Sequence, residues 1–123
     1  MIKLQEVLEI HKVLIQKFGG SQGLRDEGAL ISALQRPFSG FGETEFYPSV
    51  EEKAASILES IIKNHPFVDG NKRTAYVLMR LLLMQFGKDI KATQSEKYDF
   101  VIEIASSKIA FQEILIWLKK RVF

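Results

Sequence analysis

The sequence predicts an all-α protein, folded as a single compact helical bundle around one central buried helix. Apolar residues recur at helical spacing in six stretches, and the stretch after residue 70 is apolar on nearly all sides. The chain has 123 residues, of which 46% are hydrophobic and 26% charged. That length suffices for one core but not for two, so we expect residues 1–123 to form one domain.

The first half of the chain is expected to hold three helices and one long loop. The first helix ends at Gly19-Gly20, and the second has Asp26 as N-cap or first-turn acid and stops before Pro37. Residues 36–49 form a Gly/Pro/aromatic loop of a length that is usually functional. A third helix covers about residues 51–64. The expected apolar faces are Leu4, Val7, Leu8, Val13, Leu14 and Phe18, then Ala29, Leu30, Ala33 and Leu34, then Ala54, Ile57, Leu58, Ile61 and Ile62.

The second half begins with the central helix, which runs to about Phe86 and Gly87. The segment KDIKAT, residues 88–93, reads as a short extended stretch. Thr93 and Glu96 have the spacing of a capping box that starts the fifth helix. The last helix covers about residues 111–121. The expected buried residues are Ala75, Val77, Leu78, Leu81, Leu82 and Leu83, then Phe100, Val101 and Ile104, then Ile114, Leu115 and Leu118.

Composition excludes several classes of protein. A net charge of +2 is far below that of a nucleic-acid-binding surface, so we expect no direct nucleic-acid partner. The absence of cysteine excludes disulfides and thiolate sites, and it is compatible with a cytoplasmic protein. The longest uncharged apolar run, residues 81–86, is too short to cross a membrane.

The polar chemistry is concentrated in HPFVDGNKR, residues 65–73, directly before the central helix. Pro66 ends the third helix at His65, and Gly70 and Asn71 lead into the next one. The first turn of a helix exposes unpaired N–H groups and the positive end of the helix dipole. Lys72 and Arg73 add two cations there, which is unfavourable unless an anion binds. The pattern indicates a phosphate-binding site, although the spacing is not that of a Walker A loop.

Two neighbouring residues suit chemistry on a bound phosphate. Asp69 is placed to share a Mg²⁺ ion with the phosphates, although a role as N-cap alone fits the spacing equally well. His65 is placed to act as general base towards an attacking hydroxyl, although a single histidine at a helix end is more often a cap. We expect Phe67 to anchor the loop in the core and His11 to be structural.

The motif resembles the signature of the Fic/Doc superfamily, and specifically its Doc (death-on-curing) branch. The general Fic pattern is H-P-F-x-[DE]-G-N-G-R-x-x-R, whereas Doc proteins read H-x-F-x-[DN]-[AG]-N-K-R. Lys72 stands in place of the second glycine and Tyr76 in place of the second arginine. Residues 19–37, GGSQGLRDEGALISALQRP, also resemble the N-terminal region of Doc proteins.

The resemblance implies a toxin of a toxin–antitoxin pair. Such a toxin would be a protein kinase that transfers the γ-phosphate of ATP to a threonine or serine hydroxyl of a translation factor similar to EF-Tu, arresting protein synthesis and growth. It implies that His65 is the base, that Asp69 binds Mg²⁺, and that Gly70, Asn71, Lys72 and Arg73 hold the ATP phosphates. It also implies a Phd-like antitoxin acting in trans, because the chain contains no [ST]-x-x-x-E-[GN] segment of self-inhibiting Fic enzymes.

The sequence is also compatible with other functions. An AMP transferase of the Fic type is disfavoured by Lys72 and Tyr76, and a catalytically idle module that binds an acidic partner is disfavoured by the intact His65 and Asp69. A helical nucleic-acid-binding domain is disfavoured by the low net charge. By position, residues 36–49 correspond to the flap that docks the target peptide in Fic proteins. The alternative is an ordinary packed loop whose Phe38, Phe41 and Phe46 fill gaps in the core.

Overall fold

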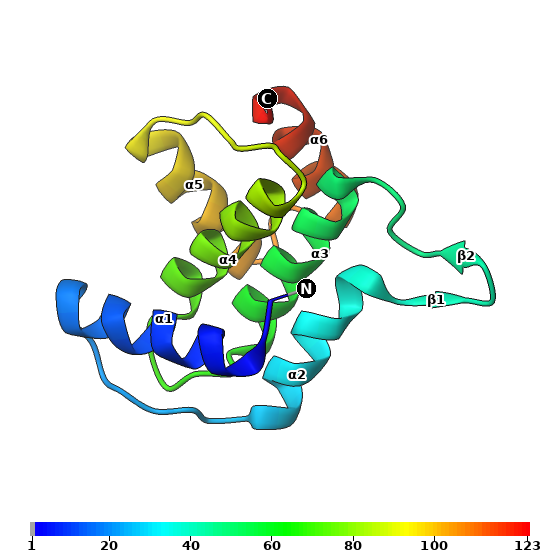
Figure 1. Ribbon diagram of the computed structural model, residues 1–123. Helices are drawn as coiled ribbons and strands as arrows, with labels where there is room; N and C mark the ends of the chain where they lie inside the picture. The colour runs from blue at the N-terminus through cyan, green and yellow to red at the C-terminus, as the bar shows by residue number, and fades with distance from the viewer. Residues whose placement is uncertain (1) are drawn as a thin grey trace.

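The computed structural model describes residues 2–123, and their architecture is a helical bundle with one short hairpin (Figure 1). The prediction of an all-α bundle is confirmed. The hairpin consists of β1 (Gly40–Phe41) and β2 (Thr44–Glu45) and follows a 3₁₀ turn, η1 (Arg36–Phe38). The helices are α1 (Leu4–Phe18), α2 (Glu27–Gln35), α3 (Val50–Asn64), α4 (Asn71–Gln85), α5 (Gln94–Ala105) and α6 (Phe111–Arg121).

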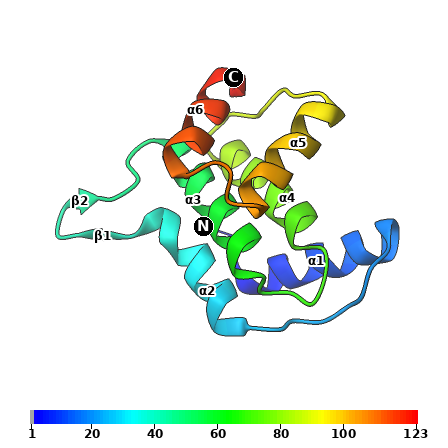
Figure 2. The ribbon, with the colours of Figure 1, turned by 180° about the vertical axis from the view of Figure 1, so that it is seen from behind.

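Two helices, α3 and α4, lie side by side at the centre of the bundle (Figures 1 and 2). The predicted central helix α4 therefore shares this place with α3, which also contacts α2, α5 and α6, while α1 packs against α4. Sequence patterns underestimate the burial of α3, because they assign polar residues to the surface, whereas Lys53, Ser56 and Ser60 of this helix are buried. Ser56 satisfies its hydroxyl within the helix, by donating to the Lys53 carbonyl at 2.8 Å.

The helices begin where their capping residues stand. Asp26 caps α2 by accepting a hydrogen bond from the Ala29 N–H at 3.0 Å. Thr93 and Glu96 form the expected capping box of α5. A second such box, between Ser49 and Glu52, starts α3 at Val50. Each box satisfies backbone N–H groups that a helix start would otherwise leave unpaired.

The buried face of α1 differs from the predicted one. Its buried residues are Val7, His11 and Ile15, which repeat every four positions. Val13 and Phe18 were expected on this face, but they are 52% and 60% exposed. The expectation was wrong because it followed only apolar residues and left out the histidine that completes the stripe facing α4 and the loop before it.

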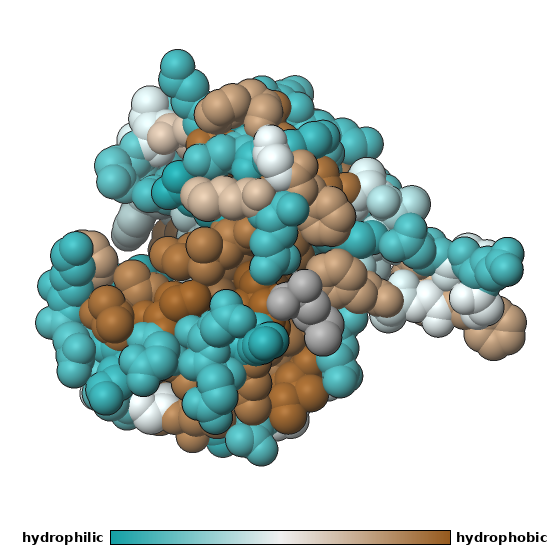
Figure 3. Space-filling view, viewed as in Figure 1, coloured by the Kyte–Doolittle hydropathy of each residue, from teal (hydrophilic) through white to brown (hydrophobic). Residues whose placement is uncertain are grey.

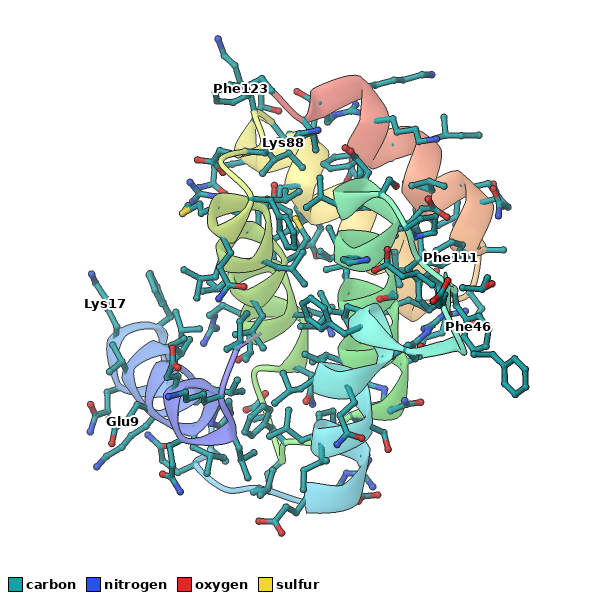
Figure 4. All side chains as sticks on the ribbon, turned by 45° about the vertical axis from the view of Figure 1, so that its right-hand side comes forward. Glu9, Lys17, Phe46, Lys88, Phe111 and Phe123 are labelled. Atoms are coloured by element: carbon teal, nitrogen blue, oxygen red, sulfur yellow. The ribbon has the colours of Figure 1, made fainter. Side chains whose placement is uncertain are left out.

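Residues 36–49 form an anchored hairpin rather than a packed loop. Arg36 donates to Tyr47 Oη and Glu59, both at 2.9 Å, and the buried Lys53 donates to Glu45 at 2.9 Å. Phe41 is 82% exposed, and Phe46, which lies on the hairpin side of the molecule (Figure 4), is 57% exposed, so the interpretation that these aromatic residues fill the core was wrong.

The expected extended stretch at residues 88–93 is present in part, as a single bridge between Ile90 and Val122. This bridge attaches the end of the chain to the segment before α5. Within residues 2–123, no helix is long and apolar enough to cross a bilayer.

Candidate functional site

The loop between α3 and α4 carries the site residues, and it begins with a strained histidine. His65 is the C-cap of α3 and lies in the left-handed region, with φ 48° and ψ 59°. A non-glycine residue in this conformation costs free energy, and such residues concentrate at functional sites. Pro66 contributes to the geometry because it disfavours right-handed helical angles at the residue before it. The side chain of His65 is exposed and therefore accessible to a substrate.

Phe67 and Asn71 close the loop. Phe67 is 1% exposed, as the anchoring role predicted. The Asn71 side chain accepts from the Phe67 N–H at 2.9 Å and donates to the Phe67 carbonyl at 3.0 Å. Both polar ends of this amide therefore bond to the loop backbone, and Asn71 is 8% exposed, so its side chain holds the loop closed.

The first turn of α4 has the character of an anion site. Its N-cap is Gly70, at φ 74°, and no side chain caps the helix. No acidic residue lies in the first turn, while Lys72 and Arg73 do. Lys72 is exposed and makes no hydrogen bond or ion pair with other residues of the described range 2–123. Free N–H groups, the helix dipole and a free ammonium group together favour a bound anion.

Asp69 stands immediately before this turn and is held as an anion. One carboxylate oxygen accepts from the Ser21 N–H at 3.1 Å, and the other accepts from the Gly70 N–H at 2.8 Å. The backbone N–H groups of Ser21 and Gly70, with smaller contributions from the nearby Arg73 and His11, lower the pKa of Asp69 below its usual value. Asp69 precedes the N-cap position, so the alternative in which it serves as the N-cap of α4 is not what the structure shows.

The donor set fits Mg²⁺ shared with phosphates. Asp69 is exposed and uses one hydrogen bond on each oxygen, so lone pairs remain for a cation. No cluster of three His, Cys, Asp or Glu side chains able to hold a metal occurs in residues 2–123. A single carboxylate is what Mg²⁺ needs when substrate phosphates and water complete its shell.

Arg73 is only partly free to meet a phosphate. Its Nη1 donates to the carbonyl of Gly19 at 3.1 Å and, more weakly, to that of Leu14 at 3.4 Å. The guanidinium group also lies 5.4 Å from the centre of the Phe18 ring. Arg73 therefore ties the end of α1 to the start of α4 and keeps its remaining N–H groups for a ligand.

Sequence reasoning missed the residues that hold this loop from α1 and from the α1–α2 connection. His11 stacks on Phe67 with ring centroids 3.8 Å apart, and its Nε2 lies 2.8 Å from the Asp69 carbonyl oxygen, to which it donates. The expected structural role of His11 is confirmed, and the structure adds that this role is to hold the site loop. A signal existed, because His11 stands four residues from both Val7 and Ile15 on the buried face.

An apolar groove of about 440 Å³ opens beside the first turn of α4, between α1 and α5 (Figure 3). We call it the α1–α5 groove. Lys72 and Arg73 stand at its wall, whereas His65 and Asp69 do not line it. Tyr76 lies within it, largely buried, with the Lys97 ammonium 4.9 Å from its ring centre. The lining residues are Leu14, Phe18, Lys72, Arg73, Tyr76, Val77, Gln94, Lys97, Tyr98, Val101 and Ile102.

Comparison with known proteins places this chain in a family. The sequence profile of the Fic/DOC family matches residues 1–83. A relative named "Toxin Doc", from Mycolicibacterium smegmatis, is 37% identical over 93 residues, which cover 72% of this chain and 70% of the relative. "Protein kinase doc" of Escherichia phage P1 is 26% identical over 122 residues, which cover 97% of this chain and 93% of the relative. The chain belongs to the Fic/DOC family, and within it to the Doc branch.

Proposed function

We propose that this protein is a Doc-like toxin that acts as a protein kinase, with ATP and Mg²⁺ as donor and cofactor. The observation that carries the proposal is the uncapped, acid-free first turn of α4 with Lys72 exposed in it, directly after the anionic Asp69. A relative in the same branch is named a protein kinase, which supports the same reaction class.

The arrangement supplies what phosphoryl transfer needs, which is mainly positioning and charge stabilisation. Backbone N–H groups of residues 71–73, with the side chains of Lys72 and Arg73, would hold the phosphates, and Asp69 would hold Mg²⁺, which would neutralise charge on them. His65 would take the proton from the attacking hydroxyl. The oxygen of the target then bonds to the γ-phosphorus, the bond to the bridging oxygen breaks, and ADP leaves.

The residues at positions 72 and 76 favour transfer of the phosphoryl group rather than AMP. The Lys72 side chain stands at the start of α4, where a glycine would leave room for β- and γ-phosphates. Tyr76 is 7% exposed and packs in the α1–α5 groove, so this position cannot supply a cationic clamp. We therefore infer that the nucleotide binds with its terminal phosphate towards His65.

The target we propose is a hydroxyl of a translation factor similar to EF-Tu, in the cytoplasm. Induced expression of this chain alone in a bacterial host should arrest growth and stop incorporation of labelled amino acids into protein. His65→Ala should restore both, because it removes the base without disturbing the core. Normal growth with abundant wild-type protein would contradict the proposal.

An antitoxin acting in trans is the second part of the proposed function. The α1–α5 groove is apolar, with Lys72, Arg73 and Lys97 among its lining residues, and it adjoins the phosphate site. An acidic segment that folds into an amphipathic helix would match both properties and block access to the site. Co-expression of the neighbouring reading frame should restore growth, and Ile102→Glu in the groove should remain toxic but escape this rescue. Equal rescue of the Ile102→Glu variant would exclude the groove.

A further inference from the structure

The connection between α1 and α2 runs alongside the site loop, antiparallel to it. Leu24 and Phe67 form a bridge, and the Val68 N–H donates to the Gly23 carbonyl at 3.0 Å. Figures 1 and 2 show the connection passing the loop between α3 and α4 at the same end of the molecule. Segments about 40 residues apart in sequence are therefore held together at the site.

The strongest of these links comes from Arg25. Its Nε donates to the carbonyl of His65, and its Nη2 to the carbonyl of Asn64, both at 2.7 Å. The backbone N–H groups of Arg25 and Asp26 donate to the Pro66 carbonyl, at 2.7 and 2.9 Å. Three consecutive carbonyl groups around His65 are thus all bonded by two adjacent residues.

This contact lies where the loop is under strain. The carbonyls of Asn64 and His65 belong to the end of α3, where the helix dipole is negative and a cation is favoured. A guanidinium group donates in a fixed planar fork, so it sets the relative direction of two carbonyls. Because a peptide plane joins each carbonyl to the next residue, fixing both carbonyls restricts the ψ of Asn64 and of His65. It therefore opposes relaxation of His65 from its left-handed conformation.

We propose that Arg25 is a positioning residue, which holds His65 in the left-handed conformation that directs its imidazole towards the substrate hydroxyl. The inference rests on the proposed function for the role of His65 as base, but the fork itself is a property of the fold. Arg25 is exposed, and its removal leaves no cavity in the core. It touches neither the first turn of α4 nor Asp69, so nucleotide binding should be independent of it.

The variants Arg25→Ala and Arg25→Lys test this role, with Lys63→Ala as matched control. Lys63 is the other cation at the end of α3, and it is exposed, without a hydrogen bond to the described residues 2–123. The measurements are the backbone and imidazole NMR signals of His65, and kcat and nucleotide KM for phosphoryl transfer. Arg25→Ala should shift or broaden the His65 signals and lower kcat at least about tenfold, with an unchanged nucleotide KM. Lys63→Ala should match the wild type in every respect.

The His65 signals and the transfer activity of the Arg25 variants together distinguish the possible outcomes. His65 signals of Arg25→Ala that superimpose on those of the wild type would overturn the proposal, whether or not the wild-type protein transfers phosphate. Arg25→Lys keeps the charge but loses the fork, so it should recover only part of the shift and of kcat. If Arg25→Lys fully recovered the wild-type His65 signals and kcat, positive charge alone would be sufficient. The proposal that the guanidinium group acts by bonding to two carbonyls would then be overturned. A wild-type protein without transfer activity, but with His65 signals that respond to Arg25→Ala, would contradict the proposed function and leave the positioning contact standing.

Discussion

His65 occupies a backbone conformation in which helix ends usually carry glycine. Its φ is 48°, while the glycine that starts the next helix, Gly70, has φ 74°. A side chain at such a position costs about 1–2 kcal/mol of folding free energy. Glycine would avoid this strain, but it loses more backbone entropy on folding, which offsets part of the gain. A protein selected for stability alone would therefore place glycine here. A histidine at this position is therefore what the proposed role as general base predicts.

Replacing His65 separates stability from activity. His65→Gly should raise the free energy of unfolding by roughly 0.5–1 kcal/mol, because it relieves the left-handed strain at a modest entropic cost. His65→Ala keeps a Cβ and should give no such gain. Both variants should lose phosphoryl transfer by roughly 100-fold or more while still binding nucleotide. Chemical denaturation and single-turnover assays measure the two effects, and a fully active alanine variant would remove His65 from the mechanism.

The role proposed for Asp69 depends on its charge rather than on its hydrogen bonds alone. Asp69→Asn keeps an acceptor for only one of the Ser21 and Gly70 N–H groups, because these two groups bond to different carboxylate oxygens, whereas Asp69→Ala removes both acceptors. Both substitutions should weaken nucleotide binding in the presence of Mg²⁺, and should leave binding without Mg²⁺ much less affected. Calorimetric titration with and without Mg²⁺ measures this. Equal loss under both conditions would assign Asp69 to loop geometry only.

At the scale of elements, the sequence predicted most of the helices because their signals are local. The capping residues Asp26 and Thr93, and the proline after His65, act within one turn and were readable directly. The contacts that shape the site are of another kind. Arg25 meets residues 64 and 65, and Ser21 meets Asp69, across about 40 to 48 positions. No periodicity encodes such pairings, since they depend on how the α1–α2 connection packs.

The predicted phosphate site also combines local signals, which the sequence shows, with long-range contacts, which it does not. The sequence predicts residues 70–73 as phosphate-binding because lysine and arginine after a glycine at a helix start favour a bound anion. It could not show that the Asn71 amide closes the loop by bonding to the Phe67 backbone, or that Arg73 reaches back to Gly19. It also missed the exposed hairpin at residues 40–45, because aromatic residues are as common in cores as on binding surfaces. Tertiary packing decides between such possibilities.

An ion pair between α4 and the segment after it makes stability depend on pH. Arg80 donates to both oxygens of Asp89, at 3.1 and 2.9 Å, and this hydrogen bonding lowers the pKa of Asp89. A depressed pKa means that the folded state favours the carboxylate, so the contribution is present above the unfolded pKa and is lost as pH falls through the folded one. Because both side chains are partly exposed, we expect about 0.5–1 kcal/mol at neutral pH.

The variant Asp89→Asn measures this contribution. It should be less stable than the wild type at pH 7, and the difference should shrink as the pH falls below about 4, where Asp89 of the unfolded chain takes up its proton and that of the folded protein does not yet. Urea denaturation at several pH values gives the two curves. A difference that stays constant from pH 7 to pH 3 would show that the pair contributes through packing rather than through charge.

At the scale of the whole molecule, α1 and α5, which flank the groove, lie on one side of the bundle, and the hairpin extends from the other side (Figure 1). The groove reaches Lys72 and Arg73, whereas the hairpin is anchored to α3 through Arg36 and Lys53. A partner bound in the groove would therefore reach the phosphate site without touching the hairpin. This separation allows inhibition by one partner and contact with another to use different surfaces.

The central claim is that this fold transfers the γ-phosphoryl group of ATP to a protein. The most direct test incubates the purified protein and Mg²⁺ with a bacterial lysate and ATP labelled at either the α- or the γ-phosphate, with the His65→Ala variant as control. Label should reach a protein from γ-labelled ATP only, with an added mass of one phosphate on the target, and no label should appear with the control. Transfer from α-labelled ATP, with an added mass of AMP, would contradict the kinase function and leave the fold and the family unchanged.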